Sequence, residues 1–173
     1  MRVRWTRFCW ELDKLPDNGS LLDPPYCIRQ AKRSEHRKVS DLLLSNLALD
    51  ADWTDLLQEF RKPFEHQIED VFDCKDLPCI VVALGQSIVG ASTLDPDPGA
   101  QNHLVSGPSV MNEYRNRGLG SALLYCSLLR LREAGIARAY GITRAGVPTA
   151  RFLYTKYNST NEPSGIEPLT VSP

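Results

Sequence analysis

The stretch Val110-Met111-Asn112-Glu113-Tyr114-Arg115-Asn116-Arg117-Gly118-Leu119-Gly120 lies between a β-rich segment and the strongest helical pattern of the chain. Gly118 and Gly120, one residue apart, let the backbone turn sharply and leave its N–H groups unshielded by a Cβ. N–H groups at a helix start have no intrahelical partner and lie at the positive end of the helix dipole. Arg115 and Arg117 add positive charge beside them. The stretch is therefore typical of an anion site suited to a diphosphate.

Two other phosphate-binding motifs do not fit this stretch. A dinucleotide fingerprint, G-x-G-x-x-G, needs a third glycine where this chain has Leu123. A Walker loop needs Gly-Lys followed by Ser or Thr, whereas Gly120 is followed directly by Ser121. A lone G-x-G is also compatible with a basic turn before an ordinary helix. The segments around the stretch are therefore needed to distinguish an anion site from such a turn.

The segments after the stretch alternate between helical and strand patterns. Residues 119–134 are predicted as a helix because their apolar residues share one face, and Gly135 stands where a helix commonly ends. That face consists of Leu119, Ala122, Leu123, Cys126 and Leu129. We expect a strand over residues 137–142, a short helix over residues 148–157 and a last strand over residues 166–171.

The segments before the stretch contain one clear hairpin. Residues 79–84 and 87–94 are β-rich runs joined by a turn at Gly85. Residues 103–110 are predicted as another strand, in which Gly107-Pro108 implies a bulge or an edge, because proline cannot donate to a β-ladder.

The first half of the chain completes the pattern. We expect a short strand over residues 26–29, a helix capped near Ser34, and a second helical region over residues 53–72 that Pro63 breaks or restarts. Residues 1–25 are predicted as an N-terminal extension, with an extra strand over residues 3–12, and residues 26–173 as one domain. This order of elements predicts an α/β (α+β) fold in which a mixed sheet lies between helices.

With these elements around it, the glycine stretch resembles the acetyl-CoA signature of the GNAT superfamily, R/Q-x-x-G-x-G/A. The run Arg115-Asn116-Arg117-Gly118-Leu119-Gly120 matches every fixed position, and Tyr114 and Val110 stand where the family often has an aromatic residue and a valine. The element order from residue 26 to residue 157 is also similar. The resemblance implies a mostly antiparallel central sheet flanked by helices, with a splayed strand at the acetyl-CoA site.

The resemblance also implies an activity: acetyl-CoA-dependent N-acetyltransfer, directly to a primary amine of a small molecule or peptide. Acetyl-CoA would be the cosubstrate, and the backbone N–H of Val110 would polarise its thioester carbonyl. The residues that the resemblance assigns to acetyl-CoA are Ser109, Val110, Arg115, Asn116, Arg117, Gly118, Leu119 and Gly120.

Tyr154 and His103 are the two candidate catalytic residues. Tyr154 matches the tyrosine that in this family often protonates the leaving thiolate, although a core aromatic residue is the plainer interpretation. His103 has a suitable intrinsic pKa for a general base, but a lone histidine at a loop edge is more often a surface residue. Ser106 and Glu113 lie near the same motif, and an ordered water could serve instead.

The chain departs from the family pattern on the acceptor side. Val147 stands where the family often has asparagine, and Tyr157-Asn158-Ser159 stands where it often has Leu-Gly-Phe. Asn158 can still adopt the left-handed conformation that glycine would serve there. These departures leave a non-catalytic acyl-CoA-binding sensor or regulatory module as an alternative. An interaction domain with a coincidental G-x-G is a further one, which the element order disfavours.

An acidic segment precedes the hairpin, where GNAT-like folds usually line the acceptor pocket. Its carboxylates are Asp50, Asp52, Asp55, Glu59, Glu65, Glu69, Asp70, Asp73 and Asp76. They are either a solvated helix face or a cluster that attracts a basic or polycationic amine.

The composition of the chain argues against several other classes of protein. The 173 residues carry a formal net charge of −1, which argues against a nucleic-acid binder and a polybasic membrane anchor. No apolar run is long enough to cross a bilayer, and no signal-peptide pattern follows Met1, so we expect a cytoplasmic protein. The five cysteines and three histidines are scattered, and neither a disulfide framework nor a metal site is expected. The sequence leaves a homodimer possible.

Overall fold

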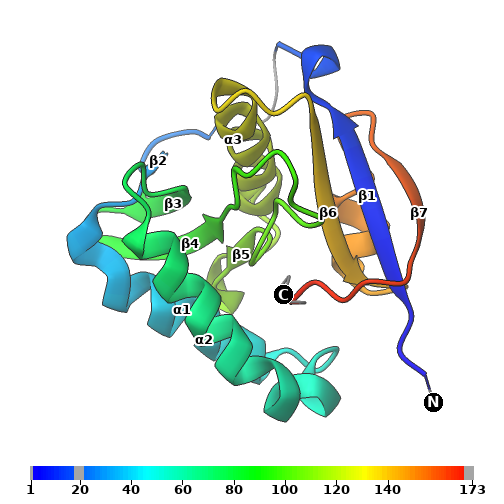
Figure 1. The fold of residues 1–173 in the computed structure, drawn as a ribbon. Coiled ribbons are helices and arrows are strands. Elements are labelled where there is room, and N and C mark those ends of the chain that lie inside the picture. Colours follow the sequence, from blue (N-terminus) through cyan, green and yellow to red (C-terminus); the bar gives the residue numbers. More distant parts are fainter. Residues whose placement is uncertain (1, 18–21, 170–173) are drawn as a thin grey trace.

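The structure, a computed structural model, describes residues 2–17 and 22–169 and contains two β-sheets (Figure 1). The first sheet has the order β2 (Tyr26–Gln30), β3 (Cys79–Leu84), β4 (Ser87–Thr93) and β5 (Ser109–Val110). The second has the order β6 (Arg138–Arg144), β1 (Trp5–Glu11) and β7 (Thr160–Ser164). Every strand pairing within the described residues is antiparallel.

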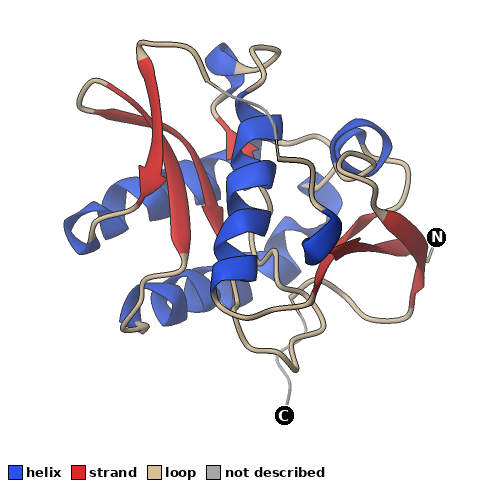
Figure 2. Cartoon of the chain, turned by 90° about the horizontal axis from the view of Figure 1, so that it is seen from above, coloured by secondary structure: helices blue, strands red, loops and turns tan. Residues whose placement is uncertain are grey.

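Helices cover both faces of the first sheet. Ile80 and Val82 of β3 point into the core that contains α3 (Leu119–Glu133). The alternate residues Val81 and Ala83 pack with α1 (His36–Leu49) and α2 (Leu57–Asp73). Figure 2 shows α3 between the two sheets. The predicted architecture, a mostly antiparallel sheet flanked by helices, is confirmed, with the sheet divided into two parts; the parallel pairing that a mixed sheet would contain is not found among the described strands.

The two sheets part at β5. This two-residue strand pairs with β4 only, through Gly90↔Val110 and Ala91↔Ser109, and pairs with no other described strand. The expected strand over residues 103–110 is therefore mostly wrong. Gly107 has φ +63° and Pro108 has no N–H, so the chain can join a ladder only after them. The result is the splayed strand that the family resemblance implied.

An irregular link upstream of β5 connects the two sheets instead. Leu104 forms an isolated bridge with Leu94, next to β4. The backbone N–H groups of His103 and Leu104 both donate to the carbonyl oxygen of Tyr140 on β6, at 2.8 and 3.3 Å. The segment before β5 is therefore bonded to β6 of the second sheet and to the residue that follows β4 of the first.

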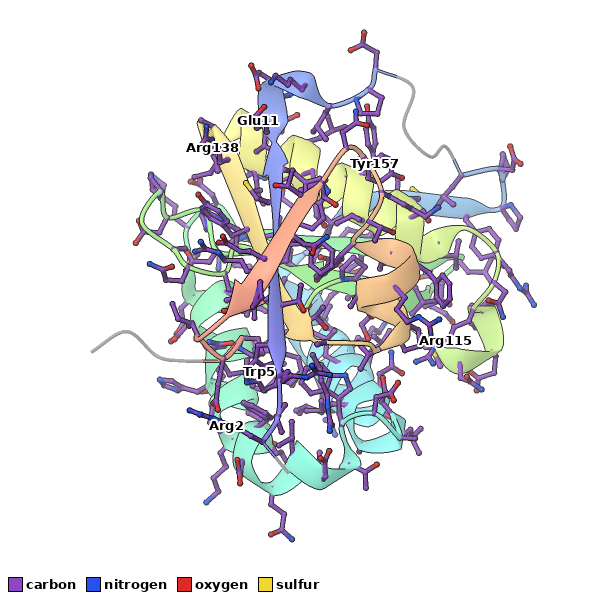
Figure 3. All side chains as sticks on the ribbon, turned by 90° about the vertical axis from the view of Figure 1, so that its right-hand side faces the viewer. Arg2, Trp5, Glu11, Arg115, Arg138 and Tyr157 are labelled. Atoms are coloured by element: carbon purple, nitrogen blue, oxygen red, sulfur yellow. The ribbon has the colours of Figure 1, made fainter. Side chains whose placement is uncertain are left out.

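The strand expected over residues 3–12 is confirmed as β1, which lies in the middle of the second sheet. Its register runs from Trp5↔Arg144 to Glu11↔Arg138. Figure 3 shows Trp5 and Glu11 at opposite ends of this strand, with Arg138 beside Glu11. Phe8 on β1 is buried in the same core as α3, so this strand is part of the main packing of the molecule.

Two expectations about helices are corrected. Pro63 does not break the second helical region, because α2 runs through it from residue 57 to residue 73. A buried face that includes Phe60, Phe64 and Ile68 offsets the hydrogen bond that proline cannot donate. The first helix begins at His36 after a 3₁₀ turn, and the carboxylate of Glu35, rather than the hydroxyl of Ser34, accepts a backbone N–H there.

The end of the chain also differs from expectation. The short helix predicted over residues 148–157 is a single π-helical turn, Thr149–Leu153. The last strand is β7, not residues 166–171; residues 166–169 form no strand, and residues 170 and 171 lie outside the described residues. Pro163 within β7 is tolerated because β7 is an edge strand of its sheet.

Candidate functional site

A cleft of about 570 Å³ opens where the two sheets part. It is lined by residues 104–110 before and within β5, the first turn of α3, the π-helical turn, and parts of α1, α2 and β6. This volume is within the usual range for small-molecule sites. The anion site predicted from the sequence at Gly118, Leu119 and Gly120 (the anion turn) lines this cleft, and so does Tyr154.

Unpaired backbone N–H groups face the cleft at the start of α3. Gly118, the residue before the helix, has φ +79°, a conformation that favours glycine. The N–H groups of Leu119, Gly120 and Ser121 donate to no residue in the described part of the chain. All three residues line the cleft. The structure thus offers several donors and the positive end of a helix dipole to an anion.

The two arginines of the motif have different positions. Arg115 lines the cleft, and its Nε donates to the carbonyl oxygen of Val110 at 3.1 Å. The π-helical turn lines the same cleft, and Figure 3 labels Arg115. Arg117 does not line the cleft and donates to the hydroxyl of Tyr26 at 2.9 Å. Of the residues expected at acetyl-CoA, all but Arg117 therefore line the cleft.

The open edge of β5 directs backbone groups away from β4. The N–H of Met111 donates to Val89 on the β4 side, at 2.9 Å. Because successive residues of a strand direct their N–H and C=O groups to opposite sides, those of Val110 face away from β4. The Val110 carbonyl is accordingly the acceptor of Arg115. The Val110 N–H thus points to the side where the sheets part.

Tyr154 is buried below the same cleft. Its ring makes edge contacts with Phe8 and Trp10, at centroid distances of 5.5 and 5.4 Å. Its hydroxyl makes no hydrogen bond with any residue that the structure describes. Burial raises the pKa of the Tyr154 phenol above its ordinary value, so the hydroxyl keeps its proton at neutral pH. The Tyr154 phenol is therefore protonated, and its position is fixed by packing.

His103 does not reach the cleft. Its ring is fully buried, its Nδ1 accepts the N–H of Tyr140 at 2.9 Å, and its Nε2 lies 3.1 Å from the carbonyl oxygen of Asp97. Burial lowers its pKa, so the ring is neutral and carries its proton on Nε2. We therefore do not retain His103 as the general base; its ring ties the link before β5 to β6. Ser106 lines the cleft, but its hydroxyl is bonded to Thr93 and Gly107.

The departures from the family pattern are visible in the structure. Val147 is buried and lines the cleft, so an apolar side chain occupies the position where the family often has an amide. Asn158 has φ +60°, the left-handed conformation expected of it, and Tyr157 shares that φ.

Several lining residues were not expected from the sequence. Asn46 on α1 donates to the hydroxyl of Ser109 on β5 at 2.8 Å. Phe60 and Phe64 on α2 line the far part of the cleft together with Trp53. Their apolar spacing indicated only a buried helix face, and no local signal marked them as cleft residues.

Other classes of site are not seen in the described part of the chain. Residues 2–17 and 22–169 contain no group of three or more His, Cys, Asp or Glu side chains arranged around a metal ion. Within the same residues, no helix has the length and apolar character needed to cross a bilayer.

Solved structures with this fold share little sequence with the chain. A Drosophila protein has a TM-score of 0.64 at 11% identity, covering 92% of this chain and 48% of its own. A GCN5-related N-acetyltransferase from Sphaerobacter thermophilus has a TM-score of 0.60 at 15% identity, covering 94% and 50%. A GCN5-related glucosamine N-acetyltransferase region of a fungal multi-domain β-N-acetylglucosaminidase has a TM-score of 0.60 at 12% identity, covering 92% and 20%. The chain thus spans half or less of these proteins, and the likeness shows the fold.

Comparison of the sequence with protein-family models identifies the family of the chain. No curated protein sequence matches the chain. Residues 47–158, more than half of its length, match the sequence model of the acetyltransferase (GNAT) family, and this range contains the anion turn, the splayed strand and Tyr154. The chain belongs to the acetyltransferase (GNAT) family.

Proposed function

We propose that the chain transfers the acetyl group of acetyl-CoA directly to a primary amine. One observation carries the proposal: a single cleft joins the unpaired N–H groups at the start of α3, the open edge of β5 and the protonated hydroxyl of Tyr154. A diphosphate, a thioester and a leaving thiolate each need one of these three features, in that order along the cosubstrate.

The described residues fit acetyl-CoA. Its diphosphate would accept hydrogen bonds from Leu119, Gly120 and Ser121, and its pantetheine arm would follow the open edge at Val110. Space at the turn is sufficient, because a Cβ added to Gly120 would meet only the side chain of Leu153, at 3.9 Å. That open volume is where a ligand can approach the backbone closely.

The reaction needs few protein groups. The neutral amine attacks the thioester carbonyl, and the Val110 N–H stabilises the oxyanion that forms. When the tetrahedral intermediate collapses, the C–N bond remains and the C–S bond breaks. The nitrogen releases its extra proton to water, since no histidine lines the described cleft. Tyr154 donates a hydrogen bond and then its proton to the departing sulfur, and solvent returns that proton.

Release of free CoA thiol, measured with a broad panel of amines, tests the activity. We expect thiol release that depends on an amine. Gly120→Val should abolish measurable acetyl-CoA binding in calorimetry while leaving the fold intact, because the larger side chain fills the space for the diphosphate. Wild-type affinity in the folded variant would contradict the site. Binding without turnover on any amine would instead identify a non-catalytic acyl-CoA-binding module.

A further inference from the structure

The end of the cleft away from the anion turn has apolar and aromatic walls. Its lining comes from α1, α2, the segment between them and β6. The apolar members include Leu43, Leu47, Trp53, Phe60, Phe64 and Ile142, and Leu169, after β7, packs against the cluster that contains Phe60 and Ile142. Trp53 makes ring contacts with Phe60 at 6.2 Å and with Trp5 at 5.8 Å, so this wall is held by aromatic packing. An apolar group that enters here is removed from water on several sides.

Two carboxylates complete this part of the cleft. Asp50 and Asp52 both line it, and neither forms an ion pair with a described residue. An oxygen of the Asp50 carboxylate accepts the backbone N–H of Asp52 at 2.9 Å, which fixes the orientation of this carboxylate. The nearby cation Arg144 donates to both carboxylate oxygens of Asp55, at 2.7 and 3.1 Å. Arg144 also donates to the backbone carbonyl oxygen of Asp52 at 2.6 Å and partly balances the charge of Asp52, so Asp50 is the carboxylate that is left for a ligand.

The cations that line the cleft belong to its other half. Arg115 is bonded to Val110. Lys156 precedes Tyr157, whose hydroxyl donates to the carbonyl oxygen of Ser121 in the first turn of α3. The charge of the cleft therefore changes from positive at the anion turn to negative at its apolar end.

The rest of the acidic segment faces elsewhere. Glu65 is paired with Arg61, and Glu69 lies 3.7 Å from His66. Glu59, Asp70, Asp73 and Asp76 do not line the cleft either. The binding surface for an amine therefore has one short negative patch, and an extended polycation would find no second one inside the cleft.

The patch is close to the position of the reaction. Asn46, which donates to Ser109 on β5, lies in the last turn of α1, and Asp50 is the first residue after that helix, with an extended backbone. Asn46, Asp50 and Ser109 all line the cleft, so Asp50 lies at the end of α1 that contacts β5, the strand that would hold the thioester. An ammonium group drawn to Asp50 is thereby kept at the end of the cleft that α1 shares with β5.

Resting on the proposed function, we propose that the acceptor is a primary amine with a single cationic nitrogen and an apolar, aryl- or alkyl-bearing body. The body fills the walls around Trp53, Phe60 and Phe64, and the nitrogen lies on the side of Asp50. Transfer converts the ammonium form to the amide: one proton leaves to water before attack, a second leaves the nitrogen afterwards, and the thiolate takes up one proton.

Four amines at equal ionic strength test this class: 2-phenylethylamine, ethanolamine, spermidine and glutamate. We expect kcat/KM to be about 10- to 100-fold higher for 2-phenylethylamine than for ethanolamine, as burial of one aromatic group implies. Asp50→Asn should lower kcat/KM for 2-phenylethylamine several-fold without changing acetyl-CoA affinity, and salt should reduce that difference. Glu59→Gln, an exposed acid of α2 outside the cleft, is the matched control and should have no effect.

The outcomes separate the acceptor class from the activity. Equal or higher kcat/KM for ethanolamine, spermidine or glutamate would overturn the acceptor class while leaving the transferase intact. If no amine is acetylated, the proposed function fails. Calorimetry of 2-phenylethylamine with the acetyl-CoA-saturated protein then tests whether the pocket binds such an amine. Binding of 2-phenylethylamine that Asp50→Asn weakens would then support the pocket, and absence of binding would overturn it.

Discussion

Gly107 determines where the hydroxyl of Tyr154 can lie, and replacing it tests the geometry of the site. A Cβ at residue 107 would be 2.5 Å from the Tyr154 hydroxyl oxygen and 3.6 Å from the ring carbon that carries it. Contacts below 3.0 Å essentially do not occur for real Cβ atoms. Tyr154 is only 2% exposed and is packed against Phe8 and Trp10, so its ring cannot simply move aside.

The expected cost of Gly107→Ala has two parts. Alanine at φ +63° costs about 1–2 kcal/mol of backbone strain. The clash with the hydroxyl adds about 1–3 kcal/mol, as for overpacked cores. In a Tyr154→Phe background the nearest remaining atom is at 3.6 Å, an ordinary contact, so only the backbone part remains. The two substitutions should therefore couple by about 1–3 kcal/mol.

Urea unfolding of the wild-type protein, the two single variants and the double variant measures this coupling. We expect Gly107→Ala to be less destabilising in the phenylalanine background than alone. In thiol-release assays, Gly107→Ala should lower turnover without a comparable loss of acetyl-CoA affinity, because it displaces the hydroxyl. A coupling free energy below about 0.5 kcal/mol, the usual scatter for independent sites, would refute the contact.

Three further predictions concern single residues. Tyr154→Phe should lower turnover by about 10²-fold or more with little change in acetyl-CoA affinity, measured where chemistry limits the rate; an unchanged rate would remove the hydroxyl from the mechanism. His103→Ala should reduce the free energy of unfolding by about 2–4 kcal/mol, from lost hydrogen bonds and a cavity, yet keep the activity per folded molecule, whereas a base would lose activity at full stability. The hydrogen bond from Arg29 lowers the pKa of Glu35 from 4.5 to about 2, so this pair stabilises the fold fully above pH 4.5 and loses that effect as the pH falls toward 2. Glu35→Gln should accordingly cost about 1–3 kcal/mol in urea unfolding at pH 7 and almost nothing near pH 2, and a pH-independent cost would contradict the ion pair.

Features with a local cause could be predicted from the sequence. The anion turn follows from the spacing of Gly118 and Gly120, and α3 follows from its apolar face and Gly135. The β3–β4 hairpin follows from two β-rich runs around Gly85. In each case the residues that determine the conformation are neighbours in the chain.

Features with a distant cause could not be predicted. The role of His103 depends on Tyr140, which lies 37 residues later, and nothing near His103 indicates that partner. Strand β7 is polar and contains Pro163, so it lacks the alternation of a strand and exists because its backbone pairs with β1. Phe60 and Phe64 follow ordinary helical spacing, and only the parting of the two sheets makes them cleft residues.

The central position of β1 has a consequence for how the cleft forms. Every partner of this strand is far along the chain: Trp5 pairs with Arg144 and Ser164. Closing such long loops is entropically costly and slow, whereas β3 and β4 pair across a short turn. As the chain is synthesised, the first sheet and α3 can assemble before β6 and β7, the partners of β1, have been made. The ring of Tyr154 packs on Phe8 and Trp10 of that late sheet, so the turn at the start of α3 can form before Tyr154 reaches its place.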